Sequence, residues 1–491
     1  MASVAAPGPL AACAPIRITP PLTGADEQND DVLGDDELTA CGQIADEQSD
    51  EEFGDEEISD DEQSSRKWRS ARFQGTLPLA LSARVPLEVF ELVMDAIEHQ
   101  PTLVAVALVC AAWYPRAMRN LYYNLEIRGR KTFNMLFKQC RASPRVKQWL
   151  AGTCKLVVDE SKWGMMASTQ RRKKNKNDNR FLHALPSGLA SLMPRVQTLH
   201  IRYGSLRFIR TDFFLALSKF ESVKSLTLGF CQLNNISQLR RIVSAFPQLT
   251  DLTMDNVAFT QQGSVGDAGA SLFQPPSHTR LRHLAVNVDN ELMATFLDWM
   301  TRSGFCASLA DLEILFNDRP ISRTLPSKLL EVAGASLTRY CEGYRGNGHD
   351  RRHGNLLQNT ALRSLQFQLI ISRHKAEDQG RRAVWIKAAD ELHGIFSTIR
   401  SRQLEHIEVH VDVRLDGSTL GSGQSSDVHE KLDLRDLHKV MSQPYFDALK
   451  DVEVKMNVFG IRTPQANSNV DEFRDILQPW SARGIVTFGR Y

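Results

Sequence analysis

The segment VQTLHIRY (196–203) carries apolar residues at its first, fourth and sixth positions, with polar residues between them. Leu199 and Ile201 therefore recur with a period of two, which is typical of a β-strand with one buried face. The same form returns in VKSLTLGF (223–230) and LTDLTMDN (249–256), which start 27 and 26 residues after the segment before. A strand that recurs at this interval predicts a repeat architecture.

The pattern continues toward the C-terminus at less regular intervals. Five more segments share it: LRHLAVNV (281–288), LADLEILF (309–316), LRSLQFQL (362–369), LEHIEVHV (404–411) and LKDVEVKM (449–456). They start 32, 28, 53, 42 and 45 residues after the preceding one, and the interval of 53 has room for a degenerate unit near SLTRYCEG (336–343). Longer helices or loops would account for the other wide intervals.

Helical patterns separate the strand segments. They are FFLALSKF (213–220), ISQLRRIVSAF (236–246), ELMATFLDWM (291–300), VWIKAADELHGIF (384–396) and VDEFRDILQPW (470–480). Strand, turn and helix in alternation predict parallel strands joined by crossover helices. A stack of such units buries a continuous core and exposes a curved face of strands. We therefore expect an α/β solenoid over 181–491. A doubly wound enzyme is the competing fold, and it needs a ligand motif after a strand.

The N-terminal 75 residues have a different composition. Between Asp26 and Glu62 there are eighteen Asp and Glu and no Lys or Arg, whereas the whole chain has a formal charge of +1. Dense like charge with few apolar groups cannot offset the ordering entropy, so we expect 1–75 to be a disordered acidic arm on a basic body. Ser49 and Ser59 precede acidic residues, a pattern typical of acidophilic casein-type kinase targets.

Composition also bounds the compartment. The eight cysteines lack a C-x-x-C pair, which argues against a disulfide framework or zinc module and indicates a reducing compartment. The N-terminus lacks a basic n-region, and the longest apolar run, 103–114, is too short to span a membrane. The basic run RRKKNK (171–176) is a nuclear signal, a solvated loop or a partner of the acidic arm. We expect a cytoplasmic or nuclear protein with no membrane and no clear nucleic-acid partner.

Helical periodicity begins before the repeats. Val89, Leu92, Val93 and Ile97 recur at helical spacing. The run LVAVALVCAAWY (103–114) is then apolar on every side, which predicts a second helix up to Pro115. A unit of about 40 residues has too few partners to cover that surface, so the surplus predicts a protein-binding face.

The segment VPLEVFELVMDAIEHQPTLVAVALVCAAWYPRAMRNLYYNLEI (85–127) resembles an F-box of the kind found in mushroom-forming fungi. Val85 replaces the usual leucine at its opening. The resemblance implies a small all-α unit over 80–127 that docks on a Skp-type adaptor and, through it, on a cullin scaffold. The residues that it assigns to adaptor binding are Pro86, Leu87, Glu88, Leu92, Val93, Ile97, Leu103, Val109, Cys110 and Trp113. Trp113, which closes the unit, is also expected to pack in its core. Residues 128–180 would follow as a helical linker and basic loop.

The strand segments resemble the irregular leucine-rich repeats of F-box proteins, although the family's asparagine at the bend is mostly missing. The polar residues beside each inward apolar pair would then face a target protein. We expect these to be His200, Arg202, Thr227, Asp255, Asn287, Glu313, Gln366, Glu408 and Lys455, with Thr253, His410 and Glu453 beside them. Their charge changes from basic at the start to acidic toward Glu408, which would give a partner its register.

Motifs for catalysis are missing from the sequence. It contains no phosphate loop, dinucleotide fingerprint, zinc-protease motif or nucleophile elbow. His349 and His353 lack a third metal ligand of clear spacing, and His406 and His410 are too far apart on a strand. Cys110 should be an inert cysteine packed inside a helix. We therefore expect neither an enzyme nor a cofactor or metal.

The predicted function is substrate recruitment to a Skp/cullin-type E3 ubiquitin ligase, with the adaptor on the F-box and an unknown target protein on the repeats. The alternative is a non-degradative F-box adaptor or a leucine-rich-repeat scaffold protein. An α/β enzyme is a weaker third hypothesis, because the sequence offers it no site.

Overall fold

A computed structural model describes residues 85–161, 181–260, 280–288, 290–316, 324–344, 353–373, 381–415, 432–459 and 463–490. Several sequence predictions concern segments outside these ranges. They are the acidic arm (1–75) with Ser49 and Ser59, the basic run 171–176, and His349. What we expect of them stays a prediction.

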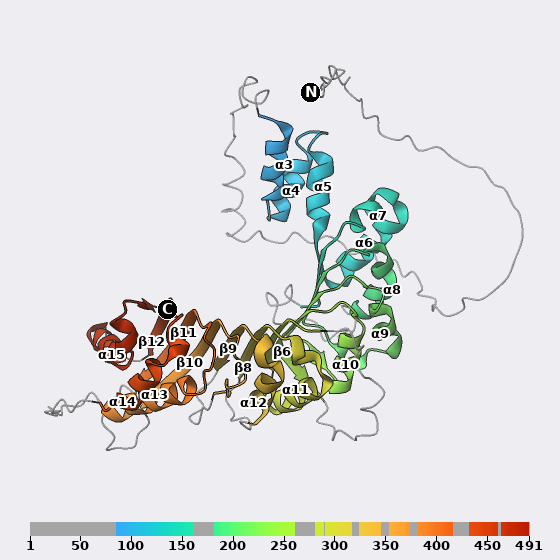
Figure 1. Ribbon diagram of the computed structural model, residues 1–491. Coiled ribbons are helices and arrows are strands. Elements are labelled where there is room, and N and C mark those ends of the chain that lie inside the picture. The colour runs from blue at the N-terminus through green and yellow to red at the C-terminus, as the bar shows by residue number, and fades with distance from the viewer. Residues whose placement is uncertain are drawn as a thin grey trace, which may run out of the picture. The chain divides into compact units, whose positions relative to one another are not determined.

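The described strands form one parallel sheet of thirteen strands (Figure 1). Its strands are β1 (Asn124–Arg128), β2 (Lys155–Asp159), β3 (Thr198–Arg202), β4 (Ser225–Gly229), β5 (Gln232–Leu233), β6 (Asp251–Phe259), β7 (His283–Val288), β8 (Asp311–Phe316), β9 (Arg339–Tyr344), β10 (Ser364–Arg373), β11 (His406–Leu415), β12 (Asp451–Phe459) and β13 (Val486–Arg490). The strand order follows the chain order, and only the short β5 lies off this path, beside β6. Doubly wound sheets bind ligands where the strand order reverses, and the described strands contain no such reversal.

All eight predicted strand segments lie in this sheet, and the degenerate unit expected near 336–343 is β9. The sheet also begins earlier than expected. β1 lies at the end of the predicted F-box segment (80–127), and β2 lies within the stretch 128–180 predicted as a linker and loop. β2 was not recognised in the sequence, because the register aligns Thr153 with Val196 of the next strand segment, and threonine is polar where the pattern requires an apolar residue.

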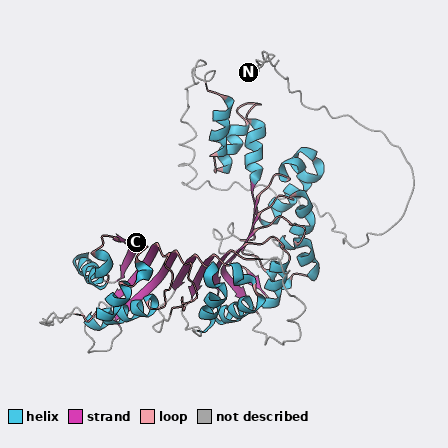
Figure 2. Ribbon diagram, viewed as in Figure 1, coloured by secondary structure: helices cyan, strands magenta, loops and turns pink. Residues whose placement is uncertain are grey.

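The helices follow one another along one side of the sheet (Figure 2). Those that follow β1 are α6 (Gly129–Ala142), α7 (Pro144–Leu150), α8 (Leu185–Leu189), α9 (Thr211–Leu217), α10 (Ile236–Ser244), α11 (Asn290–Ser303), α12 (Thr324–Ala333), α13 (Arg381–Phe396), α14 (Arg435–Met441), α15 (Thr463–Ile476) and α16 (Gln478–Ser481). Every helical stretch expected from the sequence contributes to one of them. The chain is therefore an α/β stack in which each strand adds to the one before it.

Two rows of side chains, from the second and fourth positions of the strands, face the helices. The first is Leu156, Leu199, Leu226, Leu252, Leu284, Leu312, Tyr340, Leu365, Ile407 and Val452, and the second is Val158, Ile201, Leu228, Met254, Val286, Ile314, Glu342, Phe367, Val409 and Val454. Each of these residues is at most 2% exposed. Burial of one such aliphatic side chain contributes about 1.5 to 3 kcal/mol, so these rows are the main source of stability.

Glu342 is the charged exception in the second row. It accepts hydrogen bonds from the hydroxyls of Tyr340 at 2.8 Å and Tyr344 at 2.5 Å. His353 lies 3.4 Å from Glu342 through Nδ1 and 2.7 Å from Glu391 of α13 through Nε2. Burial alone would lower the pKa of His353, but the two carboxylates raise it to about 9. Burial alone would raise the pKa of Glu342, but the effect of His353 is larger, so the pKa of Glu342 is lowered. A charged histidine thus lies between the two carboxylates and compensates the charge of the buried Glu342.

A small helical unit precedes the sheet and leads directly into β1. It consists of α3 (Leu87–Asp95), α4 (Gln100–Ala107) and α5 (Tyr114–Tyr123). Its core is small: Met94, Ala107 and Ala117 are buried, and Trp113 packs against them and against Phe90. The expected core position of Trp113 is therefore confirmed.

The second helix of this unit is shorter than the sequence pattern predicted. It ends at Ala107, and turns carry the chain to Trp113. Pro115 lies in the first turn of α5, where proline is tolerated, so it belongs to the start of a helix and not to the end of one. The turns bring Trp113 back onto Phe90, which a continuous helix through this stretch would not do.

Candidate protein-binding sites

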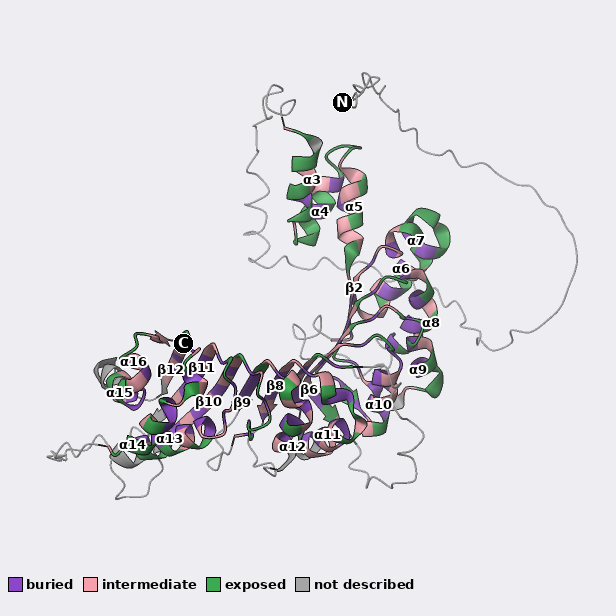
Figure 3. Cartoon of the chain, viewed as in Figure 1, coloured by how far each residue is buried: buried purple, intermediate pink, exposed green. Residues whose placement is uncertain are grey.

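Large apolar side chains are exposed on α3 and on residues 104–109, which run from α4 into the turns after it. Six aliphatic side chains here are between 44% and 80% exposed: Val89, Leu92, Val93, Val104, Leu108 and Val109. Figure 3 shows α3 and α4 with largely exposed surfaces, although their sequence is rich in apolar residues. Exposed apolar surface of this kind typically marks a protein-binding site.

Most residues that the F-box resemblance assigns to adaptor binding lie at this surface. Pro86, Glu88, Leu92, Val93, Val109 and Cys110 are exposed, and Ile97 and Trp113 are half-buried. The structure does not describe the side chain of Leu87.

Two expectations about this unit are wrong. Leu103 is 3% exposed and faces the interior, so a partner cannot reach it. Cys110 is exposed and is not a packed core cysteine, because α4 ends three residues before it. The buried thiols lie elsewhere: burial raises the pKa values of Cys231, Cys306 and Cys341 to about 12, which keeps them protonated.

The residues expected to bind a target all lie on the sheet face opposite the apolar rows. One row across the strands is Val157, His200, Thr227, Thr253, Ala285, Glu313, Cys341, Gln366, Glu408 and Glu453. A second row runs through Asp159, Arg202, Gly229, Asp255, Asn287, Leu315 and Gly343, and resumes with His410 and Lys455. We call these two rows the strand face.

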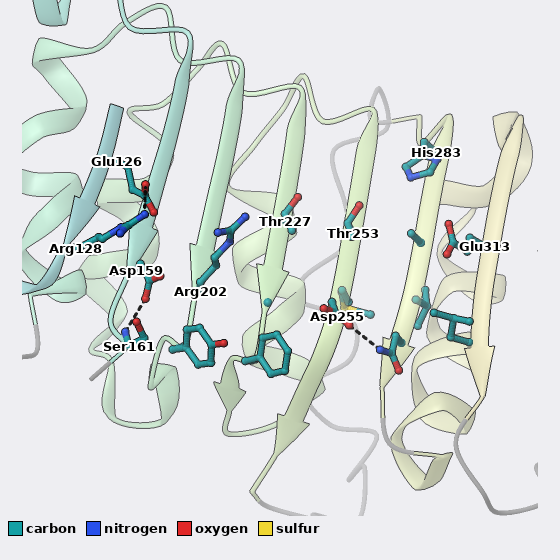
Figure 4. A pocket seen from close by; sticks show the side chains of 18 residues that line it. Glu126, Arg128, Asp159, Ser161, Arg202, Thr227, Thr253, Asp255, His283 and Glu313 are labelled. Atoms are coloured by element: carbon teal, nitrogen blue, oxygen red, sulfur yellow. Dashed lines mark hydrogen bonds and ion pairs between the residues drawn. The ribbon is translucent and has the colours of Figure 1, made fainter. Parts of the chain in front are cut away.

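A hollow of about 770 Å³ lies on the strand face over β1 to β8 (Figure 4). Five of the predicted target-binding residues line it: Arg202, Thr227, Asp255, Asn287 and Glu313. His200, Gln366, Glu408 and Lys455 are not among its lining residues. Figure 4 shows the labelled side chains projecting from neighbouring strands into the same space.

Hydrogen bonds already organise part of this lining. Asn287 is 3% exposed and donates from Nδ2 to Asp255 Oδ1 at 2.6 Å. Asp159 accepts from the backbone N–H of Ser161 at 2.7 Å. These parts of the lining are therefore held in place before a partner binds, which reduces the entropy cost of binding there.

Two aromatic residues in the hollow were missed by sequence reasoning. Tyr203 and Phe230 follow β3 and β4 directly and stack with their ring centroids 5.0 Å apart. The sequence signal was an aromatic residue immediately after two successive strands, in RYG and GFC. Strand periodicity treats those positions as the end of an element and so gives no hint that the rings meet.

The predicted gradient of charge along the strand face is weaker than expected. Burial and the nearby cations Lys155 and Arg202 lower the pKa of His200 to about 4, so this residue is neutral at pH 7. At the other end, Glu408 is paired with Lys455 and lies 2.6 Å from His410. Although burial opposes it, these partners lower the pKa of Glu408, whose charge is thus neutralised locally.

Comparison with known proteins leaves the chain unassigned: no protein-family model matches it, and no curated protein does. Across the described ranges, no group of three or more His, Cys, Asp or Glu side chains could hold a metal ion. None of the helices in these ranges is both long and apolar enough to cross a membrane.

Proposed function

We propose that the chain is the substrate-recruiting F-box subunit of a Skp/cullin-type E3 ubiquitin ligase. The unit α3–α5 would bind the adaptor, and the strand face would bind a target protein. One observation carries the proposal: a sequence that resembles an F-box forms a helical unit that leaves six large aliphatic side chains exposed.

The packing of α3–α5 supports adaptor binding. Four residues of this unit are buried, Met94, Leu103, Ala107 and Ala117, and two of them are alanines. Leu92 and Leu108 are 69% and 80% exposed, so they add little to the stability of the isolated unit. Each would gain about 1.5 to 3 kcal/mol if a partner covered it completely. Such a surface is better explained by binding than by folding.

The sheet β1–β13 with helices α6–α16, which we call the repeat body, supports the second half of the proposal. Its helices lie on one side of the sheet, and the strand face carries polar groups along many neighbouring strands. A protein that holds an adaptor at one end and a target on this face would act by proximity, since it raises the effective concentration of the target at the ligase. Ubiquitin transfer itself would belong to another subunit.

The experiment measures binding of a purified recombinant Skp-type adaptor to the full chain. Leu92→Asp should abolish the complex, because a carboxylate buried in an apolar interface is strongly unfavourable. Leu215→Asp is the matched control: Leu215 on α9 is 68% exposed and lies outside α3–α5. Its adaptor affinity should equal that of the wild type.

Two results separate the alternatives. If the wild type does not bind the adaptor, or if Leu92→Asp binds as tightly as Leu215→Asp, the F-box proposal fails and a repeat scaffold remains. If the adaptor binds but a captured target is not degraded faster in cells, the chain acts as a non-degradative adaptor.

A further inference from the structure

We propose that the hollow on the strand face binds an arginine side chain of the target protein. An aromatic platform, Tyr203 and Phe230, would stack on the guanidinium, and two oxygen acceptors, from Asp255 and Asn287, would accept its N–H groups. This inference rests on the proposed function, because it names the chemical class of segment that the strand face recruits.

The aromatic platform is a pair of rings that face solvent. The planes of Tyr203 and Phe230 are 11° from parallel, and the two residues remain 41% and 46% exposed. Both line the hollow. The face of an aromatic ring carries negative potential, so two parallel rings form a suitable platform for a planar cation.

The backbone beneath the rings is unusual for aromatic residues. The φ angle is 56° at Tyr203, 53° at Phe230 and 51° at Asn256, which follow β3, β4 and the paired part of β6 at equivalent positions. Asparagine adopts this left-handed conformation readily, whereas bulky side chains rarely do. The backbone would therefore favour asparagine at all three positions. Strained residues of this kind cluster at binding sites, which supports a binding role for the two rings.

Asn287 lines the hollow and carries a buried acceptor without a donor within the described ranges. Because its Nδ2 donates to Asp255, its Oδ1 must point away from that carboxylate. Asn287 is 3% exposed, and no group among the described residues donates to Oδ1. A buried acceptor without a donor is unfavourable, so a hydrogen bond from an N–H group of a ligand to this oxygen would contribute favourably to the binding free energy.

The platform and the acceptors are adjacent. The backbone N–H of Phe230 donates to the backbone carbonyl of Asp255 at 2.7 Å, so these two residues lie side by side in neighbouring repeats, and both line the hollow. Gly229 lies between Arg202 and Asp255 in the register and has no side chain to fill the space. A guanidinium fits this arrangement, because its flat face stacks while its edge donates to two acceptors. A lysine ammonium offers no planar face.

The charges around the hollow favour a cation. Glu126 and Arg128 neutralise each other at 2.8 Å, as His283 and Asp311 do at 3.1 Å when the histidine is protonated. The other charged residues of the lining are Asp159, Asp255, Glu313 and Arg202. Asp255 already accepts hydrogen bonds from Asn256 and Asn287. An anionic ligand would also meet the carboxylates of Asp159 and Glu313 against one guanidinium, which disfavours it.

Calorimetric titration of the full chain at physiological ionic strength tests the inference. The probe is the capped peptide acetyl-Gly-Arg-Gly-amide, with lysine, citrulline and glutamate peptides of the same length for comparison. Citrulline has the shape of arginine without its charge. We expect the arginine peptide to bind roughly tenfold more tightly than the lysine peptide, and the other two to bind more weakly still.

Two variants locate the site. Phe230→Asn and Asp255→Asn should each weaken the arginine peptide roughly five- to tenfold. Tyr123→Asn removes a comparably exposed aromatic ring, 49% exposed and outside the hollow, and should leave binding unchanged. Binding to the acidic residues 26–62 is common to all variants, so the difference between each variant and the wild type reports the hollow. Phe230→Asn should also keep or raise the thermal midpoint, because asparagine suits the local backbone.

Equal affinity of Phe230→Asn and the wild type, or preference for the glutamate or lysine peptide, would overturn the inference. A lower thermal midpoint of Phe230→Asn with unchanged binding would show that the ring is structural, and would overturn it too. The outcome is separable from the F-box proposal. Adaptor binding without arginine binding contradicts this inference alone, and arginine binding without adaptor binding contradicts the F-box assignment alone.

Discussion

Replacing His353 by glutamine should destabilise the repeat body strongly. Glu342 and Glu391 would then face each other in the core without a cation between them. Removing one partner of a buried ion pair typically costs about 3 to 5 kcal/mol of the free energy of unfolding. Urea denaturation of the full chain at pH 7, followed by far-ultraviolet circular dichroism, measures this loss.

The pH dependence gives a second and independent magnitude. The pKa of His353 is about 9 in the folded chain, against 6.5 for an unperturbed histidine. The folded state thus binds this proton more tightly. Its contribution to stability is fully present below pH 6.5 and is lost as the pH rises toward 9. This shift corresponds to about 3 kcal/mol. The difference between wild type and His353→Gln should therefore shrink over this interval.

His406→Gln is the matched control. His406 also pairs with a carboxylate, Asp451, at 3.0 Å, but its side chain is 35% exposed and that of Asp451 is 47% exposed. Exposed pairs contribute at most about 1 kcal/mol. An equal loss in both variants, or a loss for His353→Gln that does not change between pH 6.5 and 9, would refute the reasoning.

Two further predictions concern packing. Gly354→Ala should lower the free energy of unfolding by about 1 to 3 kcal/mol, because the new Cβ would lie 2.4 Å from Leu330 Cδ1 and 3.2 Å from the Tyr340 hydroxyl. Gly394→Ala in α13 is the control: its Cβ would meet no atom within 4 Å, and it should raise the free energy of unfolding by about 0.5 to 1 kcal/mol. Paired urea titrations measure both changes. Trp113→Ala should lower the free energy of unfolding of the α3–α5 unit by about 3 kcal/mol. Amide hydrogen exchange should then accelerate across 87–123, while the repeat body keeps its protection. Unchanged exchange in α3 would contradict the core role of this ring.

The alternation of apolar and polar residues predicted most of the sheet, because the residues that form the buried face of a strand all lie within that strand. Leu226 and Leu228 of β4 illustrate this, since both are fully buried as their spacing predicts. β2 was missed for an equally local reason, since Thr153 is polar at a position where the pattern requires an apolar residue. The pattern within one strand does not show which side chains lie beside it on the adjacent strands.

The binding surfaces depend on those neighbours, and there the sequence was less informative. The sequence placed Asp255 and Asn287 on the correct face, but it did not show that these residues of adjacent strands form a hydrogen bond with each other. It also took Glu408 as a free negative charge, although Lys455 of the next strand neutralises it. The Tyr203 and Phe230 stack is invisible in the sequence, because it depends on two left-handed backbone angles 27 residues apart.

The sequential strand order also has a consequence for synthesis on the ribosome. Each strand pairs with strands adjacent in the chain, so most units can pack as soon as they emerge. β9 is different, because its Glu342 pairs with His353, and His353 pairs in turn with Glu391, which is translated 49 residues after Glu342. At about 5 to 20 residues per second, this network of three residues waits roughly 2 to 10 seconds for its last member. Growth of the stack should therefore pause at β9 and resume once α13 has left the exit tunnel.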